Sequence, residues 1–343
     1  MNALVTGGGG FLGRYVVEAL LARGHAVTVF SRGSYPELEP LGARLVRGDL
    51  GELQDGGALR RAAEGCDTLF HVAAKTGVWG PYGDYERANV AGTRNVLAVC
   101  RELGIPRLVH TSSPSVVFDG RDQVRAQNDL PYPSRHLCAY AATKAQAERE
   151  VLAANGPSLS TCALRPHLVF GPRDPHLVPR LLERARSGRL AIVGSGRNEV
   201  SLCYAENAAD AHLLAAESLR PDAPHAGRAY FIAQDEPVGL WPWIGELLGR
   251  SGLPPVKRRV PLALAFAAGT LCEIAWRARR RLDEPPMTRF VALALARSHS
   301  YDMEPARRDF GYRPRVGMDE ALVRTLRFLG ASQERPPGAR DPG

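Results

Sequence analysis

The sequence predicts an α/β protein built on a doubly wound parallel β-sheet, with a smaller C-terminal lobe. Three observations support this fold class: a glycine-rich turn directly after the apolar run at residues 1–6, further short apolar runs, and helical segments between them. Strands that alternate with helices form parallel sheets covered on both faces. The further runs that we expect to be strands are residues 26–30, 44–46, 68–72 and 108–111. We expect one helix to begin at Asn89, before the run at 108–111, and another to span residues 177–186.

The alternation of strands and helices divides the chain. We expect a dinucleotide-binding domain at residues 1–165, with residues 202–233 returning to it. The alternation weakens after this domain, so residues 166–201 and 234–330 are assigned to a substrate lobe. Residues 331–343 are polar and rich in Pro and Gly, which predicts a disordered tail.

The composition narrows the class of protein. The chain has 343 residues, 45% of them hydrophobic, which suits a globular enzyme with a large core. The net charge of +8 permits an anionic partner, but there is no nucleic-acid-binding module, so we expect no nucleic-acid partner. Six scattered cysteines without a Cys-x-x-Cys pair predict neither a metal site nor a disulfide framework, and fit the reducing cytoplasm. We expect no signal peptide, because the first strand begins at Met1.

The glycine-rich turn at residues 7–13 (GGGGFLG) carries the first functional signal. Gly7 permits a tight turn, Gly10 lets the backbone approach a pyrophosphate, and Gly13 lets the following helix pack close to the strand. The helix N-terminus then offers unpaired N–H groups and a positive dipole end to phosphate. Because the motif lies between an apolar run and an amphipathic segment, it predicts a Rossmann-type dinucleotide site.

The end of the second strand indicates which dinucleotide is bound. An acidic residue there would accept a hydrogen bond from the ribose 2′-hydroxyl of NAD, but this chain has Ser31 and Arg32. A hydroxyl and a guanidinium suit a 2′-phosphate, so NADP(H) is preferred. The alternative is that Arg32 only faces solvent and that NAD(H) binds as well.

Other residues at strand ends are expected at the same edge of the sheet. Asp49 follows the third strand, the small residues Ala73 and Ala74 follow the fourth, and Ser113 follows the fifth. Ligands of such sheets bind at the carboxyl ends of the strands. We therefore expect the cofactor and the reacting groups to meet there.

Tyr140 and Lys144 are four residues apart, so on a helix they share one face. A nearby ammonium and a cationic nicotinamide would favour the phenolate and lower the pKa of Tyr140. The tyrosine could then exchange a proton with an alcohol or carbonyl oxygen of the substrate. Ser113 could donate a hydrogen bond to the same oxygen. The alternative for Lys144 is a solvated helix lysine.

Several other enzyme classes are not supported. The chain has no His-Glu-x-x-His, no Gly-x-Ser-x-Gly and no Walker-type lysine after the first glycines. His167 has two interpretations: it contacts a substrate carboxylate or the nicotinamide, or it serves only packing.

The turn at residues 6–13 (TGGGGFLG), Ser113, and the pair Tyr140 and Lys144 together resemble the extended short-chain dehydrogenase/reductase family. The resemblance covers residues 1 to about 330. Within that family, three segments resemble the 3β-hydroxysteroid dehydrogenase branch and sterol-4α-carboxylate 3-dehydrogenases in particular: residues 111–120, 165–179 and 204–217. Three others resemble bacterial 2-alkyl-3-oxoalkanoate reductases of olefin synthesis: residues 32–38, 284–290 and 303–312.

This resemblance implies an NAD(P)-dependent enzyme that acts on CH–OH groups, with Ser113, Tyr140 and Lys144 as catalytic residues. It also implies a set of cofactor neighbours, which we combine with the residues indicated above. The steroid enzymes often have an acidic residue after the second strand, and this chain departs from that pattern. The expected cofactor-binding residues are Gly7, Gly10, Phe11, Leu12, Gly13, Ser31, Arg32, Asp49, Leu50, Ala73, Ala74, Lys75, Tyr140, Lys144, Pro166 and His167.

The two groups of enzymes imply related substrates, each with oxygen at C3, a carboxylate on the adjacent carbon and a large apolar body. Oxidation of the 3-hydroxy acid gives a 3-keto acid that can lose carbon dioxide, and one site catalyses both directions. We place a 3β-hydroxysterol or 4-carboxysterol first and NADPH-dependent reduction of a long-chain 2-alkyl-3-oxo acid second. A non-catalytic cofactor-binding scaffold is a third interpretation.

The most apolar stretch is residues 260–276 (VPLALAFAAGTLCEIAW). Its 13 uncharged residues, 260–272, are short of the roughly 20 that span a bilayer. Arg277 and Arg279 to Arg281 follow, a pattern that suits peripheral contact with an anionic membrane surface. The alternative is a helix that caps the substrate pocket. We expect a cytoplasmic protein, either free or at the inner face of a membrane, and a homodimer is one of the states that the sequence permits.

Overall fold

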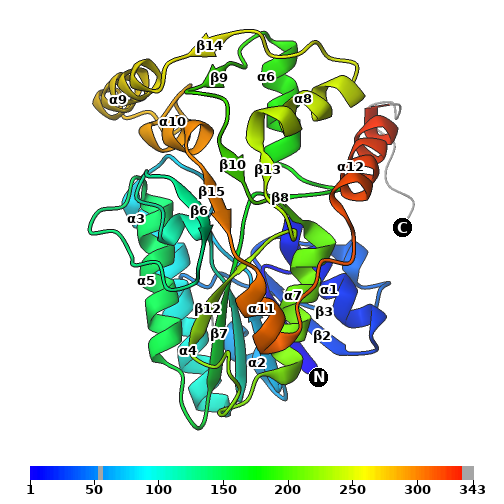
Figure 1. Ribbon diagram of the computed structural model, residues 1–343. Helices are drawn as coiled ribbons and strands as arrows, with labels where there is room; N and C mark the ends of the chain where they lie inside the picture. Colours follow the sequence, from blue (N-terminus) through cyan, green and yellow to red (C-terminus); the bar gives the residue numbers. More distant parts are fainter. Residues whose placement is uncertain (53–56, 334–343) are drawn as a thin grey trace.

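The computed structural model describes residues 1–52 and 57–333 and shows a sheet domain with a lobe above it (Figure 1). A seven-stranded sheet forms the centre, in the order β12-β7-β5-β4-β1-β2-β3. Neighbouring strands are all parallel, which confirms the doubly wound sheet. The strands are β1 (Asn2–Thr6), β2 (Ala26–Ser31), β3 (Arg44–Arg47), β4 (Thr68–His71), β5 (Arg107–Thr111), β7 (Ser160–Pro166) and β12 (Arg228–Ile232).

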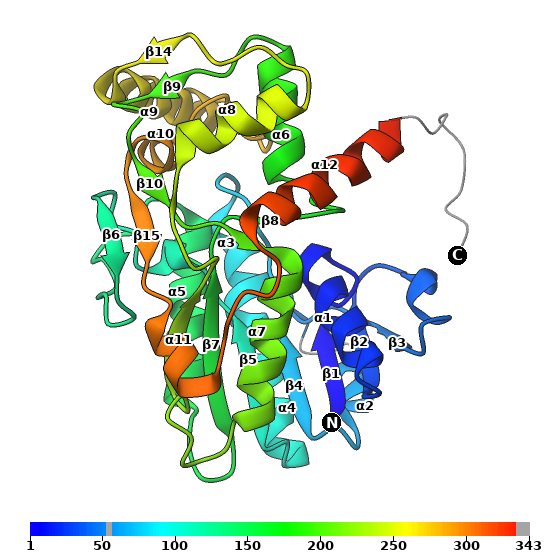
Figure 2. The same cartoon turned by 45° about the vertical axis from the view of Figure 1, so that its right-hand side comes forward.

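Both faces of the sheet are buried, which explains why its strands are continuous apolar runs. In β1, Ala3 and Val5 belong to the core on one face, and Leu4 belongs to the core on the other. The first face is covered by α1 (Phe11–Ala22) and α7 (Ala205–Ser218), and the second by α2 (Ala58–Ala63), α4 (Gly92–Leu103) and α5 (Ala139–Ala153). Figure 2 shows α1 and α7 side by side in front of the strands.

The helical segment before β5 begins earlier than the sequence predicts. We expected it to begin at Asn89, but α3 (Tyr82–Tyr85) leads through a π-helical turn (Glu86–Ala91) into α4. A π-helical turn widens the helix and often marks a functional site. Here the buried Asn89 accepts a hydrogen bond from the Lys75 backbone N–H at 2.7 Å and donates one to its carbonyl oxygen at 3.1 Å. Asn89 thereby fixes the chain that follows β4.

The lobe has its own apolar core, which includes Leu182, Trp243 and Ile244. The helix predicted at residues 177–186 is found with the same bounds. Two short parallel pairs, β8 (Val169–Phe170) with β11 (Cys203–Tyr204) and β9 (Ile192–Val193) with β14 (Arg259–Val260), complete this region. The helices of the lobe are α6 (Leu177–Arg186), α8 (Leu240–Arg250), α9 (Leu262–Ala278), α10 (Arg289–Ala296) and α12 (Met318–Gln333).

The C-terminal segment that we expected to be disordered is only partly described. Helix α12 extends to Gln333, so residues 331–333 are helical rather than disordered. Residues 334–343 lie outside the described residues. Among the residues that the structure describes, there is no helix both long and apolar enough to cross a bilayer.

A second sheet, which the sequence did not predict, joins the lobe to the sheet domain. Its order is β13 (Val238–Gly239), β10 (Glu199–Val200), β15 (His299–Tyr301) and β6 (Gln123–Ala126). The Tyr301 ring stacks on Phe231 of β12 at 3.9 Å between centroids. Helix α11 (Glu304–Phe310) follows and packs into the core of the sheet domain. Part of the segment assigned to the lobe therefore contacts the sheet domain, and the domain boundaries stay a prediction.

A buried ion pair lies under α5. Arg165 of β7 donates two hydrogen bonds to Glu148 of α5, from Nε at 2.9 Å and from Nη2 at 2.6 Å. Both side chains are at most 3% exposed. Tyr132 donates a third hydrogen bond to Glu148 at 2.6 Å. The nearby guanidinium holds the pKa of the Glu148 carboxyl below its ordinary value although burial opposes this.

We expect Glu148→Ala to lower the free energy of unfolding by about 3–5 kcal/mol, because it leaves Arg165 charged and unpaired in the interior. Urea unfolding measures the change. The matched control on the same helix is Glu150→Ala, which removes a pair with the exposed Arg94. A half-exposed pair contributes little, so this control should change stability by no more than about 1 kcal/mol. Equal losses in the two variants would contradict the buried-charge argument.

Candidate active site

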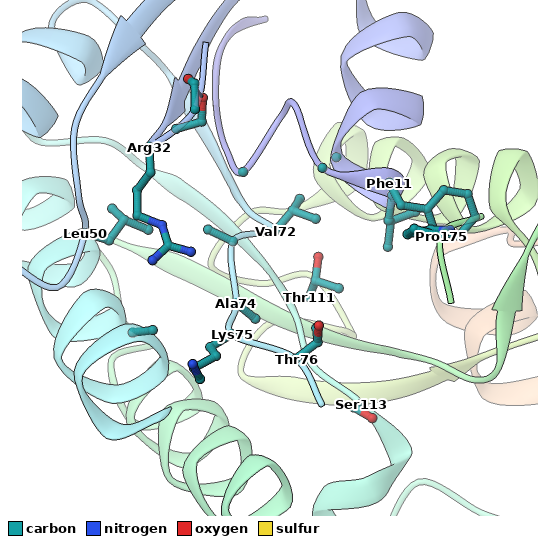
Figure 3. Close-up of a pocket in the computed structure, with 18 of the residues that line it drawn as sticks. Phe11, Arg32, Leu50, Val72, Ala74, Lys75, Thr76, Thr111, Ser113 and Pro175 are labelled. Carbon is teal, nitrogen blue, oxygen red and sulfur yellow. Dashed lines mark hydrogen bonds between the residues drawn. The ribbon is translucent and has the colours of Figure 1, made fainter. Parts of the chain in front are cut away.

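The carboxyl ends of the central strands open into a cavity of about 600 Å³ (Figure 3). It is lined by the glycine-rich turn after β1, the ends of β2 to β5 and the first turns of α5. Ser113 lines it, and so does every expected cofactor-binding residue except His167. These are Gly7, Gly10, Phe11, Leu12, Gly13, Ser31, Arg32, Asp49, Leu50, Ala73, Ala74, Lys75, Tyr140, Lys144 and Pro166.

The glycine-rich turn is tight enough to require its glycines. Gly7 has a φ of +70°, and a Cβ there would lie 2.7 Å from Ala73 Cα. A Cβ on Gly13 would lie 2.1 Å from the Gly7 carbonyl oxygen. Gly10 caps α1 without a side-chain hydrogen bond, so N–H groups of the first turn are available to an anion. These residues fit the pyrophosphate of a dinucleotide.

The opposite end of the cavity is cationic. Figure 3 shows the Arg32 side chain beside Leu50 at this end of the cavity. Its guanidinium makes no ion pair with residues 1–52 or 57–333, whereas its carbonyl oxygen accepts a hydrogen bond from Arg47 Nε at 2.9 Å. Ser31 donates to the Gly33 carbonyl oxygen at 3.2 Å. This end therefore offers an available guanidinium to a negatively charged group.

Tyr35 is a lining residue that the sequence analysis missed. Its ring covers the glycine-rich turn so closely that a Cβ on Gly9 would lie 2.1 Å from it. A Cβ on Gly33 would meet the same side chain at 2.9 Å. The signal that could have identified it is the pair of glycines, Gly9 and Gly33, which leave room for a ring beside the glycine-rich turn.

Ser113 and Tyr140 lie together at the inner end of the cavity. Ser113 Oγ lies 3.0 Å from the Ser115 hydroxyl, which donates to it. Burial raises the pKa of Tyr140 to about 12, and a hydrogen bond with Ser113 opposes the shift. For the polypeptide alone, the expected lowering of this pKa by Lys144 is therefore wrong.

The contacts of Lys144 explain this result. Its Nζ donates to the Thr111 carbonyl oxygen at 2.6 Å and lies 3.1 Å from His110 Nε2. The side chain is 2% exposed, and burial lowers the pKa of Lys144 to about 7, with Glu148 opposing the shift. Lys144 is thus a buried lysine held by β5 rather than a solvated one. An ammonium has three protons, so one remains for a group in the cavity.

Three buried histidines lie behind Lys144, and the sequence analysis missed all of them. His212 Nδ1 contacts the Ala208 carbonyl oxygen at 2.7 Å, so it donates and leaves Nε2 to accept from Thr111 Oγ1 at 2.8 Å. Burial lowers the pKa of His212 to about 4 and that of His71 to about 3. Burial lowers the pKa of His110 well below its ordinary value, and the charge of Lys144 adds to this shift. His110 therefore accepts a hydrogen bond from Lys144 as a neutral ring. This role could not be predicted from the sequence, because a strand buried on both faces shows no alternation of polar and apolar residues.

His167 lies apart from the cavity lining. Its Nε2 is 2.6 Å from His299 Nδ1, and its ring packs edge-on against Tyr301. This is the packing arrangement that the sequence left open. Its predicted place beside the cofactor has no contact among the described residues to support it.

The chain after β8 packs against α1, which follows the glycine-rich turn, and the sequence did not predict this. Arg173 makes two hydrogen bonds to Glu18 of α1, at 2.6 and 2.7 Å, and Tyr15 donates to the Pro172 carbonyl oxygen at 2.7 Å. Asp174 caps α6 by accepting from backbone N–H groups. Other lining residues that were not predicted include Thr76, Ala88, Thr111, Ser112, Val169, Asp174, Pro175 and His176. Within residues 1–52 and 57–333, no three His, Cys, Asp or Glu side chains could together hold a metal ion.

Comparison with known proteins identifies a matching family, similar sequences and a similar solved structure. The model of the 3-beta hydroxysteroid dehydrogenase/isomerase family matches residues 4–263. A 2-alkyl-3-oxoalkanoate reductase of Stenotrophomonas maltophilia is 49% identical over 326 residues, covering 94% of this chain and 98% of the relative. A decarboxylating sterol-4-alpha-carboxylate 3-dehydrogenase of Mus musculus is 39% identical over 331 residues, covering 94% and 89%. The structure of MoeE5 in complex with UDP-glucose and NAD has a TM-score of 0.73 at 25% identity, covering 97% of this chain and 100% of that one.

We expect Tyr140→Phe to lower turnover by at least about 100-fold, the scale of general acid–base catalysis. The change removes the hydroxyl, which carries the only acidic proton of the side chain, and leaves the ring in place, so the affinity for the cofactor should change little. Steady-state kinetics and cofactor titration measure the two effects. Tyr230→Phe is the matched control, because Tyr230 lies outside the cavity lining and its hydroxyl donates to Asp309. Turnover like that of the wild type in Tyr140→Phe would refute the catalytic assignment.

Proposed function

The chain belongs to the 3-beta hydroxysteroid dehydrogenase/isomerase family, and on that basis we propose that it uses NADPH to reduce the 3-oxo group of a long-chain 2-alkyl-3-oxo acid. Its relatives are named as reductases and dehydrogenases, and the chain is an NAD(P)-dependent oxidoreductase. The single observation that carries the substrate class is the similarity to a 2-alkyl-3-oxoalkanoate reductase along almost the whole length of both proteins.

This proposal reverses the order of the two substrates from the sequence analysis, which placed the sterol first. The reductase relative is 49% identical and the sterol relative 39%, over similar lengths. Oxidation of a 4-carboxysterol remains the second candidate, supported by the mouse relative. The two reactions differ in direction and in the apolar body of the substrate, but they share the oxygen at C3 and the neighbouring carboxylate.

The site supports this chemistry through three side chains. The bound cofactor supplies the hydride. Ser113 would donate a hydrogen bond to the carbonyl oxygen of the substrate, and Tyr140 would deliver its proton to that oxygen. The buried Lys144, held by Thr111 and His110, would stabilise the phenolate that Tyr140 leaves behind. These groups lie together at one end of the cavity, which argues against a non-catalytic scaffold.

The preference for NADPH over NADH rests on the cationic end of the cavity. Arg32 follows β2, where an acidic residue would select NAD, and its guanidinium is free of ion pairs with the described residues. A guanidinium can bind a phosphate through two charge-assisted hydrogen bonds. We therefore assign the 2′-phosphate to Arg32, with Ser31 beside it.

The proposed substrate is apolar, and we propose a cytoplasmic protein that meets it by peripheral contact with a membrane. The contact is expected at α9 and the arginines that follow it. A homodimer is an alternative use of the same surface.

The test of the substrate class uses purified protein with NADP⁺ and the 2-alkyl-3-hydroxy acid, because the 3-oxo acid loses carbon dioxide by itself. We expect formation of reduced cofactor with long-chain acids and none with the Tyr140→Phe variant. A 4-carboxysterol is offered in parallel, with either oxidised cofactor. Turnover of the sterol and none of any hydroxy acid would establish the second candidate instead.

We expect Arg32→Ala to weaken NADPH binding by at least about tenfold and to leave NADH binding almost unchanged, because it removes a charge-assisted contact made only to the 2′-phosphate. Titration of both cofactors into both proteins measures this. Arg121→Ala, which changes an arginine with an 88% exposed side chain, is the control for loss of one positive charge. An equal loss for the two cofactors would show that Arg32 does not distinguish them.

A further inference from the structure

A second cavity, of about 670 Å³, lies beside the active site. It is enclosed by three parts of the chain: residues 78–82 before and at the start of α3, residues 136–142 around the start of α5, and the C-terminal end of α9 with the segment that follows. Apolar side chains form much of its wall, among them Val78, Trp79, Leu137 and Trp276. None of the catalytic residues described above lines it.

The two cavities share their walls. The chain after β4 lines the active site with residues 72–76 and the second cavity with residues 78–82. Helix α5 presents Tyr140 to the active site and Ala139 and Ala142 to the second cavity. The second cavity is therefore separated from the catalytic tyrosine only by the thickness of these two segments.

Arginines form the rim of the second cavity. Arg277 lies over the Trp79 ring at 5.4 Å, and Arg281 lies over the Trp276 ring at 4.6 Å. The indole of Trp79 donates to the Arg281 carbonyl oxygen at 3.1 Å, which ties the rim to the loop after β4. Arg280 has a φ of +52° and, like Arg279, makes no ion pair with the described residues. Arg277 pairs with Glu273 and Arg281 with Asp283, so Arg280 of the rim and the neighbouring Arg279 are the cations that no described residue neutralises.

Helix α9 leads from this rim along an apolar surface. Its inner face packs against α10: Glu273 pairs with Arg289, and a Cβ on Gly269 would lie 2.7 Å from the Thr288 backbone. On its outer face, Leu264, Leu271 and Ile274 are between 57% and 67% exposed. Figures 1 and 2 both show α9 at the outer edge of the lobe. We call Leu264, Ala267, Ala268, Leu271 and Ile274 the α9 face.

Cations flank the α9 face at both ends. Lys257 and Arg258 precede α9 and are exposed, and the arginines of the rim follow it. An apolar helix face bounded by exposed cations matches a surface that is apolar inside and anionic outside, which describes a bilayer with anionic headgroups. A second copy of this chain fits less well, because a twofold interface across the α9 face would bring cationic clusters together.

We propose that the α9 face docks on an anionic phospholipid membrane, so that the second cavity opens towards the lipid and receives an alkyl chain of the substrate. The arginines of the rim then lie at the headgroups, and Leu282, 72% exposed beside them, enters the apolar layer. The docking proposal depends only on the α9 face and the cations that flank it. The alkyl chain as occupant of the cavity rests on the proposed function.

Co-sedimentation with vesicles tests the docking, using phosphatidylcholine alone and phosphatidylcholine mixed with phosphatidylglycerol. We expect binding to the anionic vesicles, weakened by salt. The double variant Arg279→Gln/Arg280→Gln should bind roughly 30-fold more weakly, from the usual contribution of a cation near an anionic surface. The triple variant Leu264→Ser/Leu271→Ser/Ile274→Ser should lose binding. Leu41→Ser and Arg121→Gln, at exposed sites elsewhere, are the matched controls and should bind like the wild type.

Tryptophan fluorescence reports on the cavity. Trp79 and Trp276 lie at the rim, whereas Trp241 and Trp243 are buried in the lobe. Brominated lipids should quench the wild type, and the loss of quenching in Trp79→Phe/Trp276→Phe would assign the signal to the rim. Equal binding to neutral and anionic vesicles, or unchanged binding of the triple variant, would overturn the proposal. So would a stable dimer that the triple variant abolishes.

Activity measurements separate this proposal from the proposed function. A short, water-soluble 2-alkyl-3-hydroxy acid should be turned over equally by the wild type and the triple variant. A long-chain acid presented in anionic vesicles should be turned over more slowly by the variant. If neither acid is a substrate, the proposed function fails while vesicle binding still decides the docking. If both acids are turned over equally by the two proteins, the docking role in substrate uptake is wrong.

Discussion

The active site depends on a buried lysine whose charged form has to be supported by the residues around it. An ammonium removed from water needs acceptors from the protein, since burial alone favours the neutral amine. The end of β5 supplies two of them, the Thr111 carbonyl oxygen and the neutral His110 ring. One helical turn further along α5, Glu148 adds a carboxylate that Arg165 holds in its charged form. The positions of β5, β7 and α5 are therefore all fixed by what surrounds Lys144.

The same arrangement explains the opposite pKa shifts of the two catalytic groups. Burial disfavours charge on either side chain, so it raises the pKa of Tyr140 and lowers that of Lys144. The polypeptide alone thus holds its proton on the tyrosine, the state that a reductase needs when it donates to a carbonyl oxygen. In the direction of oxidation the same tyrosine must first lose this proton, which burial makes harder.

The sequence predicted the central sheet well and the rest of the fold less well, for physical reasons. Strands β1, β2, β4 and β5 are buried on both faces, and such strands appear as continuous apolar runs. The second sheet gave no such signal, because β10 and β13 have only two residues each. Helix α6 was predicted at its observed bounds, whereas the π-helical turn at Glu86–Ala91 moved the start of the helical segment before α4.

In the candidate site, too, the residues that belong to a local sequence pattern were predicted and those defined by distant contacts were not. Gly7, Gly13 and Tyr140 were found because each belongs to a motif with fixed spacing. Tyr35 and His110 were missed because their roles come from contacts between segments that are distant in the chain. The orientation of the Lys144 amine was also beyond the sequence, since only the fold shows that Thr111 and His110 are nearer to it than solvent.

The second sheet has a consequence for how ligands come and go. Its strands come from four separate parts of the chain, and β15 pairs with β10 of the lobe and with β6 beyond β5. A hinge between the lobe and the sheet domain would have to break these pairings together with the stacking of Tyr301 on Phe231. Wide opening of the two parts is thus costly, and exchange of cofactor and product is expected to proceed by movement of local segments. Ligand exchange in such a protein is expected to depend on the movement of short loops rather than on rotation of one domain against the other.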